Sequence, residues 1–262
     1  MRNIIYLFVV TSVLISCQKV IDINLNESNP TPVFEGIYSA EDSTVNVKLS
    51  LTSNYFNSET SSSINNALVS ITDNTGLTSI IPSIGDGMYK LQNYIPSFNT
   101  TYTLSVNYND VVYSIQSDLT DPVPLDAITY EYTPGIFGPN SGYMVFLNFN
   151  DPIAIANYYQ VVLSLNGEEL NTLADMLILD DSLLDGNFVS TPLFREELFQ
   201  VGDTIGMELR SIDKDVYHYF YELYSTLGGD SAAPANPSSN WDNNALGYFS
   251  AYGNSRKDIV IQ

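Results

Sequence analysis

The only cysteine of the chain, Cys17, follows Leu14, Ile15 and Ser16 at the end of a short apolar segment. An aliphatic residue, a small or β-branched one, a small one and then cysteine form the pattern at which bacterial lipoproteins are acylated. The chemistry would be a thioether bond between the cysteine sulfur and a diacylglycerol. Because each buried methylene contributes about 0.8 kcal/mol, several acyl chains would hold the protein at a membrane. We therefore expect a covalent lipid on Cys17.

The residues before Cys17 predict how the N-terminus is processed. Arg2 precedes an apolar run over residues 4–15, which is too short to span a bilayer. We expect residues 1–16 to be a cleaved lipoprotein signal peptide and residues 17–29 to be a lipidated tether. The alternative is an ordinary secretory signal that ends in a free cysteine. Once the lipid has consumed the thiol, the chain cannot form a disulfide.

Acidic side chains gather most densely at Asp180, Asp181 and Asp185. Their oxygens suit Ca²⁺, so these residues are candidate calcium ligands, although the segment lacks the alternating ligands and terminal glutamate of an EF-hand loop. The alternative is a solvated loop. The whole chain has 9 basic and 30 acidic residues and a net charge of −21. This balance disfavours nucleic acid and anionic lipid head groups as partners.

Catalytic chemistry finds little support in the sequence. The single histidine, His218, lies in an aromatic run, where packing or surface exposure is favoured over a role as general base. One histidine without a free thiol cannot build a zinc site of nitrogen and sulfur ligands. Asp and Glu are numerous enough to supply the two carboxylates of a glycosidase, but no spacing singles out a pair. We expect a protein without enzymatic activity. Its only expected bound groups are the covalent lipid and the candidate calcium ion.

Aromatic residues are the remaining candidates for binding. The chain has 19 Tyr and 12 Phe, and flat rings stack on sugars while the tyrosine hydroxyl adds a polar group. Alternating strand positions explain most of these rings as core or cross-strand pairs. Trp241 in a polar loop, followed by Tyr248 and Phe249, could contact a ligand or a partner. The alternative is that Trp241 anchors its own loop.

These residues must be positioned mainly by β-strands. Residues 44–51 alternate with period two, so their aliphatic side chains share one face. Further short strands are expected over 67–72, 101–106 and 111–115, with Asn and Gly turn signals between them. Their even spacing, without a helical pattern, predicts an antiparallel β-sandwich of immunoglobulin-like or prealbumin-like type over residues 30–120.

A second β-rich domain is expected over residues 125–262, after a stiff connection that contains Pro122 and Pro124. Its strands are predicted over 128–132, 143–149, 158–165, 203–210 and 259–261. Asp213 can cap a helix near 213–227, which Gly228 and Gly229 would end. The fold class is therefore mainly β, with one α-helix in the second domain.

Several segments resemble a known family. They are the start Cys17-Gln-Lys-x-Ile-Asp-Ile-Asn-Leu, the strand Phe34-Glu35-Gly36, the tyrosines of Asn157-Tyr158-Tyr159 after Asp151-Pro152, and above all Ala245-Leu246-Gly247-Tyr248-Phe249-Ser250-Ala251. Together they resemble the domain-of-unknown-function family 4249 over essentially the whole mature chain. The resemblance implies an outer-membrane lipoprotein of Bacteroidota, often encoded beside TonB-dependent receptors, with no activity established for the family.

Two function classes follow from the sequence and the resemblance. The first is a lipid-anchored accessory or binding subunit of an outer-membrane β-barrel complex, either a TonB-dependent receptor or a larger barrel machine. Display on the cell exterior is favoured over the periplasmic face, with Asp22 as the acidic residue near Cys17. The alternative is a surface glycan-binding protein or a glycan hydrolase that uses Asp/Glu pairs.

Overall fold

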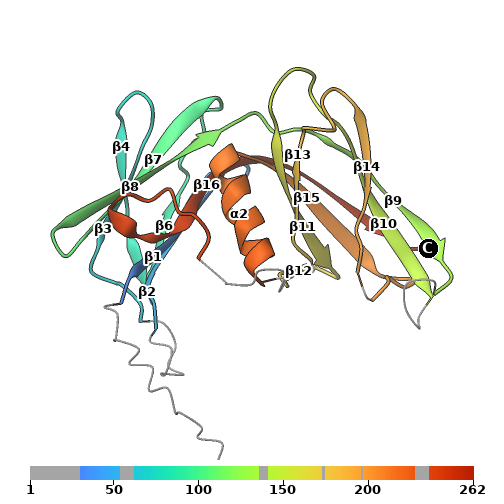
Figure 1. Cartoon of the computed structure of the whole chain (residues 1–262), viewed down its shortest axis with the longest axis horizontal. Coiled ribbons are helices and arrows are strands. Elements are labelled where there is room, and N and C mark those ends of the chain that lie inside the picture. Colours follow the sequence, from blue (N-terminus) through green and yellow to red (C-terminus); the bar gives the residue numbers. More distant parts are fainter. Residues whose placement is uncertain (1–29, 54–61, 136–140, 173–174, 196, 228–235) are drawn as a thin grey trace, which may run out of the picture.

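The computed structural model of this chain describes residues 30–53, 62–135, 141–172, 175–195, 197–227 and 236–262. Cys17 and the expected helix stop at Gly228 and Gly229 lie outside these residues. Within the described part the chain is mainly β, as the sequence predicts, and Figure 1 shows two groups of strands with the helix α2 between them.

The largest sheet of the described residues has nine strands in the order β12-β11-β15-β16-β1-β2-β6-β5, with β13 also pairing with β11. In β1 and β11, buried positions alternate with half-buried ones, as in sheets with one covered face. The strands are β1 (Pro32–Ser39), β2 (Thr44–Leu51), β5 (Ser83–Gly85), β6 (Met88–Gln92), β11 (Tyr158–Leu165), β12 (Glu168–Leu170), β13 (Leu177–Asp180), β15 (Thr204–Ile212) and β16 (Leu246–Val260).

Two smaller antiparallel sheets cover the two halves of this large sheet. The first has the order β4-β3-β7-β8 and the second the order β14-β10-β9. Their strands are β3 (Leu68–Thr72), β4 (Thr78–Ile81), β7 (Thr100–Tyr108), β8 (Val111–Leu119), β9 (Leu125–Thr133), β10 (Gly142–Asn150) and β14 (Phe188–Pro192). Each half is thus an open sandwich with its own hydrophobic core.

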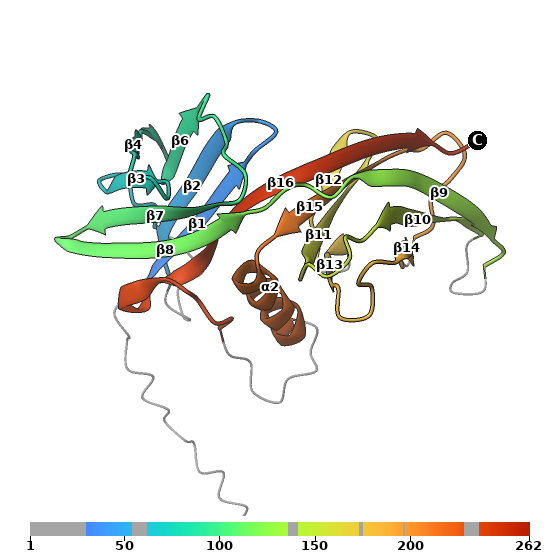
Figure 2. The ribbon, with the colours of Figure 1, turned by 90° about the horizontal axis from the view of Figure 1, so that it is seen from above.

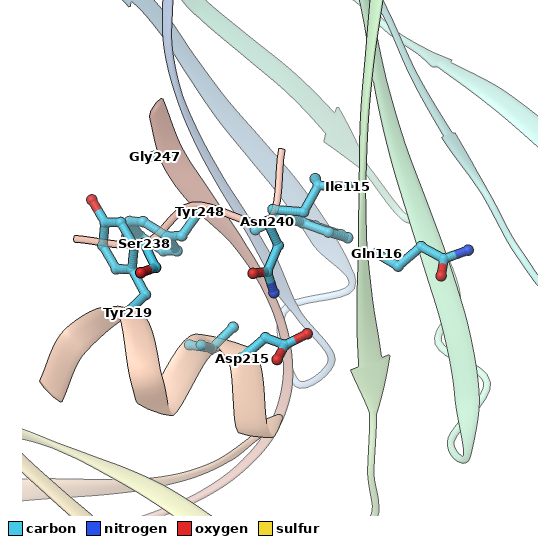
Figure 3. A pocket seen from close by; sticks show the side chains of 10 residues that line it. Ile115, Gln116, Asp215, Tyr219, Ser238, Asn240, Gly247 and Tyr248 are labelled. Atoms are coloured by element: carbon cyan, nitrogen blue, oxygen red, sulfur yellow. The ribbon is translucent and has the colours of Figure 1, made fainter. Parts of the chain in front are cut away.

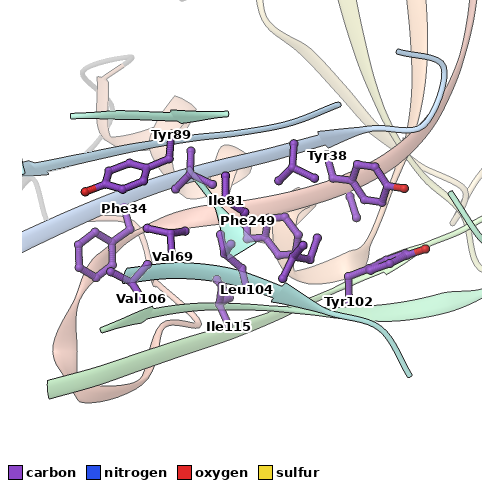
Figure 4. Packing of buried hydrophobic residues seen from close by; sticks show 14 of the residues in the cluster. Phe34, Tyr38, Val69, Ile81, Tyr89, Tyr102, Leu104, Val106, Ile115 and Phe249 are labelled. Carbon is purple, nitrogen blue, oxygen red and sulfur yellow. The ribbon is translucent and has the colours of Figure 1, made fainter. Parts of the chain in front are cut away.

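The first core lies between β1 and β2 on one side and β3, β7 and β8 on the other (Figure 4). Phe34 and Tyr38 alternate with outward residues on β1, and Tyr102 and Leu104 do so on β7, so each strand turns one row of side chains inward. Gly36 lies between the two inward rings of β1. A Cβ there would lie 2.6 Å from Leu104 Cδ2, so a larger residue would have to displace this buried side chain.

The strand β16 runs through both halves (Figure 2). Its first part, from Leu246 to Tyr252, pairs in parallel with β1, and its second part pairs antiparallel with β15 from Gly253 onward. Phe249 and Ala251 therefore belong to the first core. The sequence-based boundary assigned all of 125–262 to the second domain, whereas Trp241, Ala245, Phe249 and Ala251 pack in the first core. The division into two domains itself stays a prediction.

The helix α2 (Lys214–Leu227) covers the junction of the two halves (Figure 1). Its apolar side, with Val216 and Phe220, packs on Ile212 and Tyr252 in a third small cluster. The helix begins one residue after Asp213, as predicted from the sequence, because the Asp213 carboxylate accepts the Val216 N–H at 2.9 Å. A short 3₁₀ turn, η2 (Asp242–Asn244), precedes β16.

Candidate functional site

Asp213 joins the helix to the first half of the molecule. Besides capping α2, its Oδ2 accepts a hydrogen bond from the Ser117 hydroxyl and one from the Asp118 N–H at 3.3 Å, both on β8. Ser117 in turn accepts the Ala251 N–H at 2.9 Å. One mostly buried carboxylate therefore fixes the first turn of α2 against β8 and β16. Burial raises the pKa of Asp213 above its ordinary value, against the lowering effect of these hydrogen bonds.

This raised pKa predicts a pH-dependent difference between the wild type and Asp213→Asn. An acid whose folded-state pKa lies above 3.8 binds its proton more tightly in the folded state. Its stabilising contribution is complete below 3.8 and is lost as the pH rises through the folded-state pKa. Urea unfolding from pH 3.5 to 7 should therefore show the free energy of unfolding of the wild type falling relative to the variant as the pH rises. A relative increase would contradict the prediction.

A polar groove of about 380 Å³ opens between β8, the first turn of α2 and the segment that leads into β16. Figure 3 shows Asn240 extending toward Asp215 of α2, with Gln116 on the opposite strand. Tyr219 and Tyr248 border the narrower continuation of the groove, and their ring centroids lie 5.1 Å apart. Amide, carboxylate and tyrosine groups around one groove can exchange hydrogen bonds with a hydroxyl-rich ligand.

Asp242 of η2 also lines this groove. The Asp242 carboxylate accepts the Ser114 N–H at 2.7 Å and the Ser114 hydroxyl at 2.6 Å, and Asn243 Nδ2 donates to the Val112 carbonyl at 2.8 Å. These side chains occupy the outer edge of β8 as a neighbouring strand would. They protect an exposed strand edge from pairing with another chain.

Two of the aromatic residues proposed for ligand or partner contact are core residues. Trp241 is 4% exposed and Phe249 is 1% exposed, and both pack in the first core. Trp241 Nε1 donates to the Phe34 carbonyl at 3.2 Å. Their expected contact role needs correction, because neither ring reaches the surface. Tyr248 is partly buried against α2 and lines the groove, so it stays a candidate.

The acidic residues singled out by the sequence are only partly brought together. Asp181 and Asp185 lie with Asp151 in a cluster in which one carboxylate oxygen of each residue lies within 4.8 Å of the other two. Asp180 faces elsewhere: its carboxylate accepts hydrogen bonds from Ser182 and, at 3.2 Å, from the Tyr217 hydroxyl. The candidate calcium set is therefore corrected by replacing Asp180 with Asp151. Calcium binding stays a prediction.

Hydrogen bonds within this cluster hold two loops together. The buried Asp151 accepts the Tyr159 hydroxyl at 2.5 Å and the Gly186 N–H at 3.2 Å. Burial, followed by the bond to Asp151, raises the pKa of Tyr159, so its hydroxyl stays a donor. The only sequence signal for Asp151 was its place before Pro152, at the end of a predicted strand.

The remaining catalytic candidate is on the surface. His218 lies on the exposed side of α2, where its ring contacts Tyr217 at a centroid distance of 5.6 Å.

No helix among the described residues is long and apolar enough to cross a membrane.

Comparisons with solved structures find similar chains at low sequence identity. A two-domain fibronectin type-III segment of chicken tenascin is 13% identical, with 71% of this chain and 88% of that chain covered and a TM-score of 0.22. The FN1–FN3 domains of chicken CNTN1 are 11% identical, with 90% and 69% covered and a TM-score of 0.29. An alpha-L-rhamnosidase from Dictyoglumus thermophilum is 12% identical, with 71% and 28% covered and a TM-score of 0.25.

No curated protein matches the chain. A family model does match, over residues 18–258, which is nearly the whole chain beyond Cys17. Its description is "Domain of unknown function (DUF4249)". The segments that suggested this family, from Phe34-Glu35-Gly36 to the strand that carries Phe249, lie within the match. This protein therefore belongs to the DUF4249 family.

Proposed function

We propose that this protein is a non-enzymatic lipoprotein of the outer membrane, displayed on the cell exterior, that serves as an accessory or binding subunit of a β-barrel complex. The barrel would be a TonB-dependent receptor or a larger barrel machine. A lipid on Cys17 would supply the anchor, and the tether of residues 17–29 would lead into β1.

The observation that carries this proposal is a group of exposed apolar side chains on two adjacent loops. Ile153 and Ile155 follow β10, Leu183 follows β13, and Phe188 begins β14 at the end of the second loop. Their exposed fractions are 76%, 58%, 90% and 61%. Single exposed apolar residues are ordinary, but a cluster on neighbouring loops is typical of a protein interaction site. We call these four residues the loop patch.

The position of the loop patch agrees with such a role. In Figure 1, β1 and β2 reach the lower left of the molecule, whereas the loops after β10 and β13 lie side by side at the top. A chain anchored through the segment before β1 would therefore present the loop patch away from its own attachment point. This arrangement supports contact with a neighbouring protein.

Isolation of the full-length lipidated protein tests the proposal. After extraction in mild detergent and affinity purification, mass spectrometry should recover an outer-membrane β-barrel protein. The Cys17→Ala variant cannot be acylated and should recover at least about tenfold less, because it loses the high local concentration that shared membrane attachment gives. Recovery of no barrel protein with the wild type would overturn the proposal.

The second candidate is a surface glycan-binding protein, and the groove favours it. Asp215, Asn240 and Gln116 offer carboxylate and amide groups beside Tyr248, a set of groups suited to sugar hydroxyls and ring faces. The same groove would be the place to seek the carboxylate pair of a glycan hydrolase. Failure to recover any barrel protein would favour this candidate.

A further inference from the structure

The loop patch is held in one arrangement by hydrogen bonds beneath it. The Ala154 N–H donates to Asp185 Oδ1 at 2.6 Å, and the Asn157 N–H donates to Asp181 Oδ2 at 3.0 Å, so the middle and the last residue of the first loop are tied to the second loop. The Asp151 N–H donates to the Asn187 carbonyl at 3.0 Å. The two loops that carry the apolar side chains are therefore held in a fixed arrangement relative to each other.

The two loops also pack directly against each other. Ile153 lies over Gly186, where an added Cβ would be only 3.0 Å from the Cβ of Ile153. Gly186 has a φ of +69°, which glycine adopts without strain. Preorganised loops lose little conformational entropy when a partner binds. Less of the free energy gained by burying their apolar side chains is therefore offset.

The charge around the loop patch indicates what kind of surface would cover it. Leu183, the most exposed of the four residues, lies between Asp181 and Asp185, and Asp151 is beneath them. The chain as a whole has a net charge of −21. A second copy of this chain or an anionic membrane surface would meet like charge here, which costs free energy. A basic surface would meet opposite charge.

We propose, on the basis of the proposed function, that the loop patch docks into an apolar pocket bordered by lysine or arginine residues on the partner protein. Leu183 enters the pocket, with Ile153, Ile155 and Phe188 around it. The negative charge of Asp181 and Asp185, close to Leu183 in the sequence, attracts the basic border and orients the two surfaces.

Photocrosslinking locates the contact. A photoreactive amino acid replaces Leu183 in the full-length lipidated protein, and in a control it replaces Val112, which is 55% exposed at the β7–β8 hairpin in the other half of the molecule. Illumination in native outer membranes should give a barrel-protein adduct at position 183 and none at 112. An adduct at 183 with lipid or with a second copy of this chain would overturn the inference.

Two matched variants test the charge of the pocket. Leu183→Lys removes the apolar contact and places a cation against a basic border, so barrel recovery should fall by about tenfold or more. Leu183→Glu removes the same contact but keeps the charge attraction, so recovery should fall by about threefold or less. Because the Leu183 side chain is 90% exposed, both variants should unfold at the same temperature as the wild type.

The outcomes separate this inference from the proposed function. A greater loss with Leu183→Glu than with Leu183→Lys would overturn the basic border. Unchanged barrel recovery with both variants, together with an adduct at 112, would overturn the loop patch as the contact while leaving the accessory role intact. Recovery of no barrel with the wild type would overturn both.

Discussion

Replacing Gly247 by alanine is expected to lower the free energy of unfolding by at least about 3 kcal/mol. Gly247 has a φ of +104°, which side-chain-bearing residues rarely adopt. An added Cβ would also lie 2.1 Å from the carbonyl oxygen of Phe34, the residue paired with Gly247 across the β1–β16 ladder. The clash is with backbone, so it can be relieved only by moving β1 away from β16.

Gly167→Ala is the matched control. Gly167 also has a positive φ, +88°, but an added Cβ there would meet nothing within 4 Å. Its substitution should cost about 1 kcal/mol, the backbone strain alone. Urea unfolding followed by far-ultraviolet circular dichroism gives both values. Equal losses in the two variants would show that the contact with Phe34 adds nothing.

Local patterns in the sequence predicted much of the fold. The strands over 44–51 and 158–165 have the bounds predicted from the sequence, and α2 begins beside Asp213 as its capping pattern indicated. In each case the signal lies within about ten adjacent residues, because strand alternation and helix capping are local properties.

The long strand β16 could not be predicted in the same way. The sequence indicated a strand only over 259–261, whereas β16 spans Leu246–Val260. Its parallel partner β1 begins at Pro32, so more than half the chain separates the two strands. Parallel pairing at that distance leaves no turn or hairpin signal between the partners. For the same reason the sequence placed Trp241, Phe249 and Ala251, which pack in the first core, in the second half.

The candidate site shows the same division between local and long-range information. Asp181 and Asp185 were found because they are close in sequence, but Asp151 joins them only through the fold. Trp241 lay in a polar segment and was predicted to be able to contact a ligand, yet its ring crosses into the first core. The loop patch was missed as well, because exposed apolar residues and buried ones look alike in a strand-rich sequence.

Trp241→Ala is expected to lower the free energy of unfolding by about 3–5 kcal/mol, the usual cost of removing a large buried ring. Trp241 packs edge-on against Phe34, with ring centroids 5.2 Å apart, and its Nε1 donates to the Phe34 carbonyl. Trp241→Phe is the control, since it keeps most of the ring but removes the donor. It should cost about 1 kcal/mol, the usual net contribution of one hydrogen bond. A loss below 1 kcal/mol in Trp241→Ala would contradict this.

The two large predictions converge on one atom, the carbonyl oxygen of Phe34. Trp241 donates a hydrogen bond to it, and Gly247 leaves the space beside it empty. Gly247→Ala would displace this carbonyl, so the hydrogen bond removed by Trp241→Phe would already be weakened. The double variant Trp241→Phe/Gly247→Ala should therefore lose less stability than the sum of the single losses, by about 0.5 kcal/mol or more. Additive losses would show that the two residues act on β1 independently.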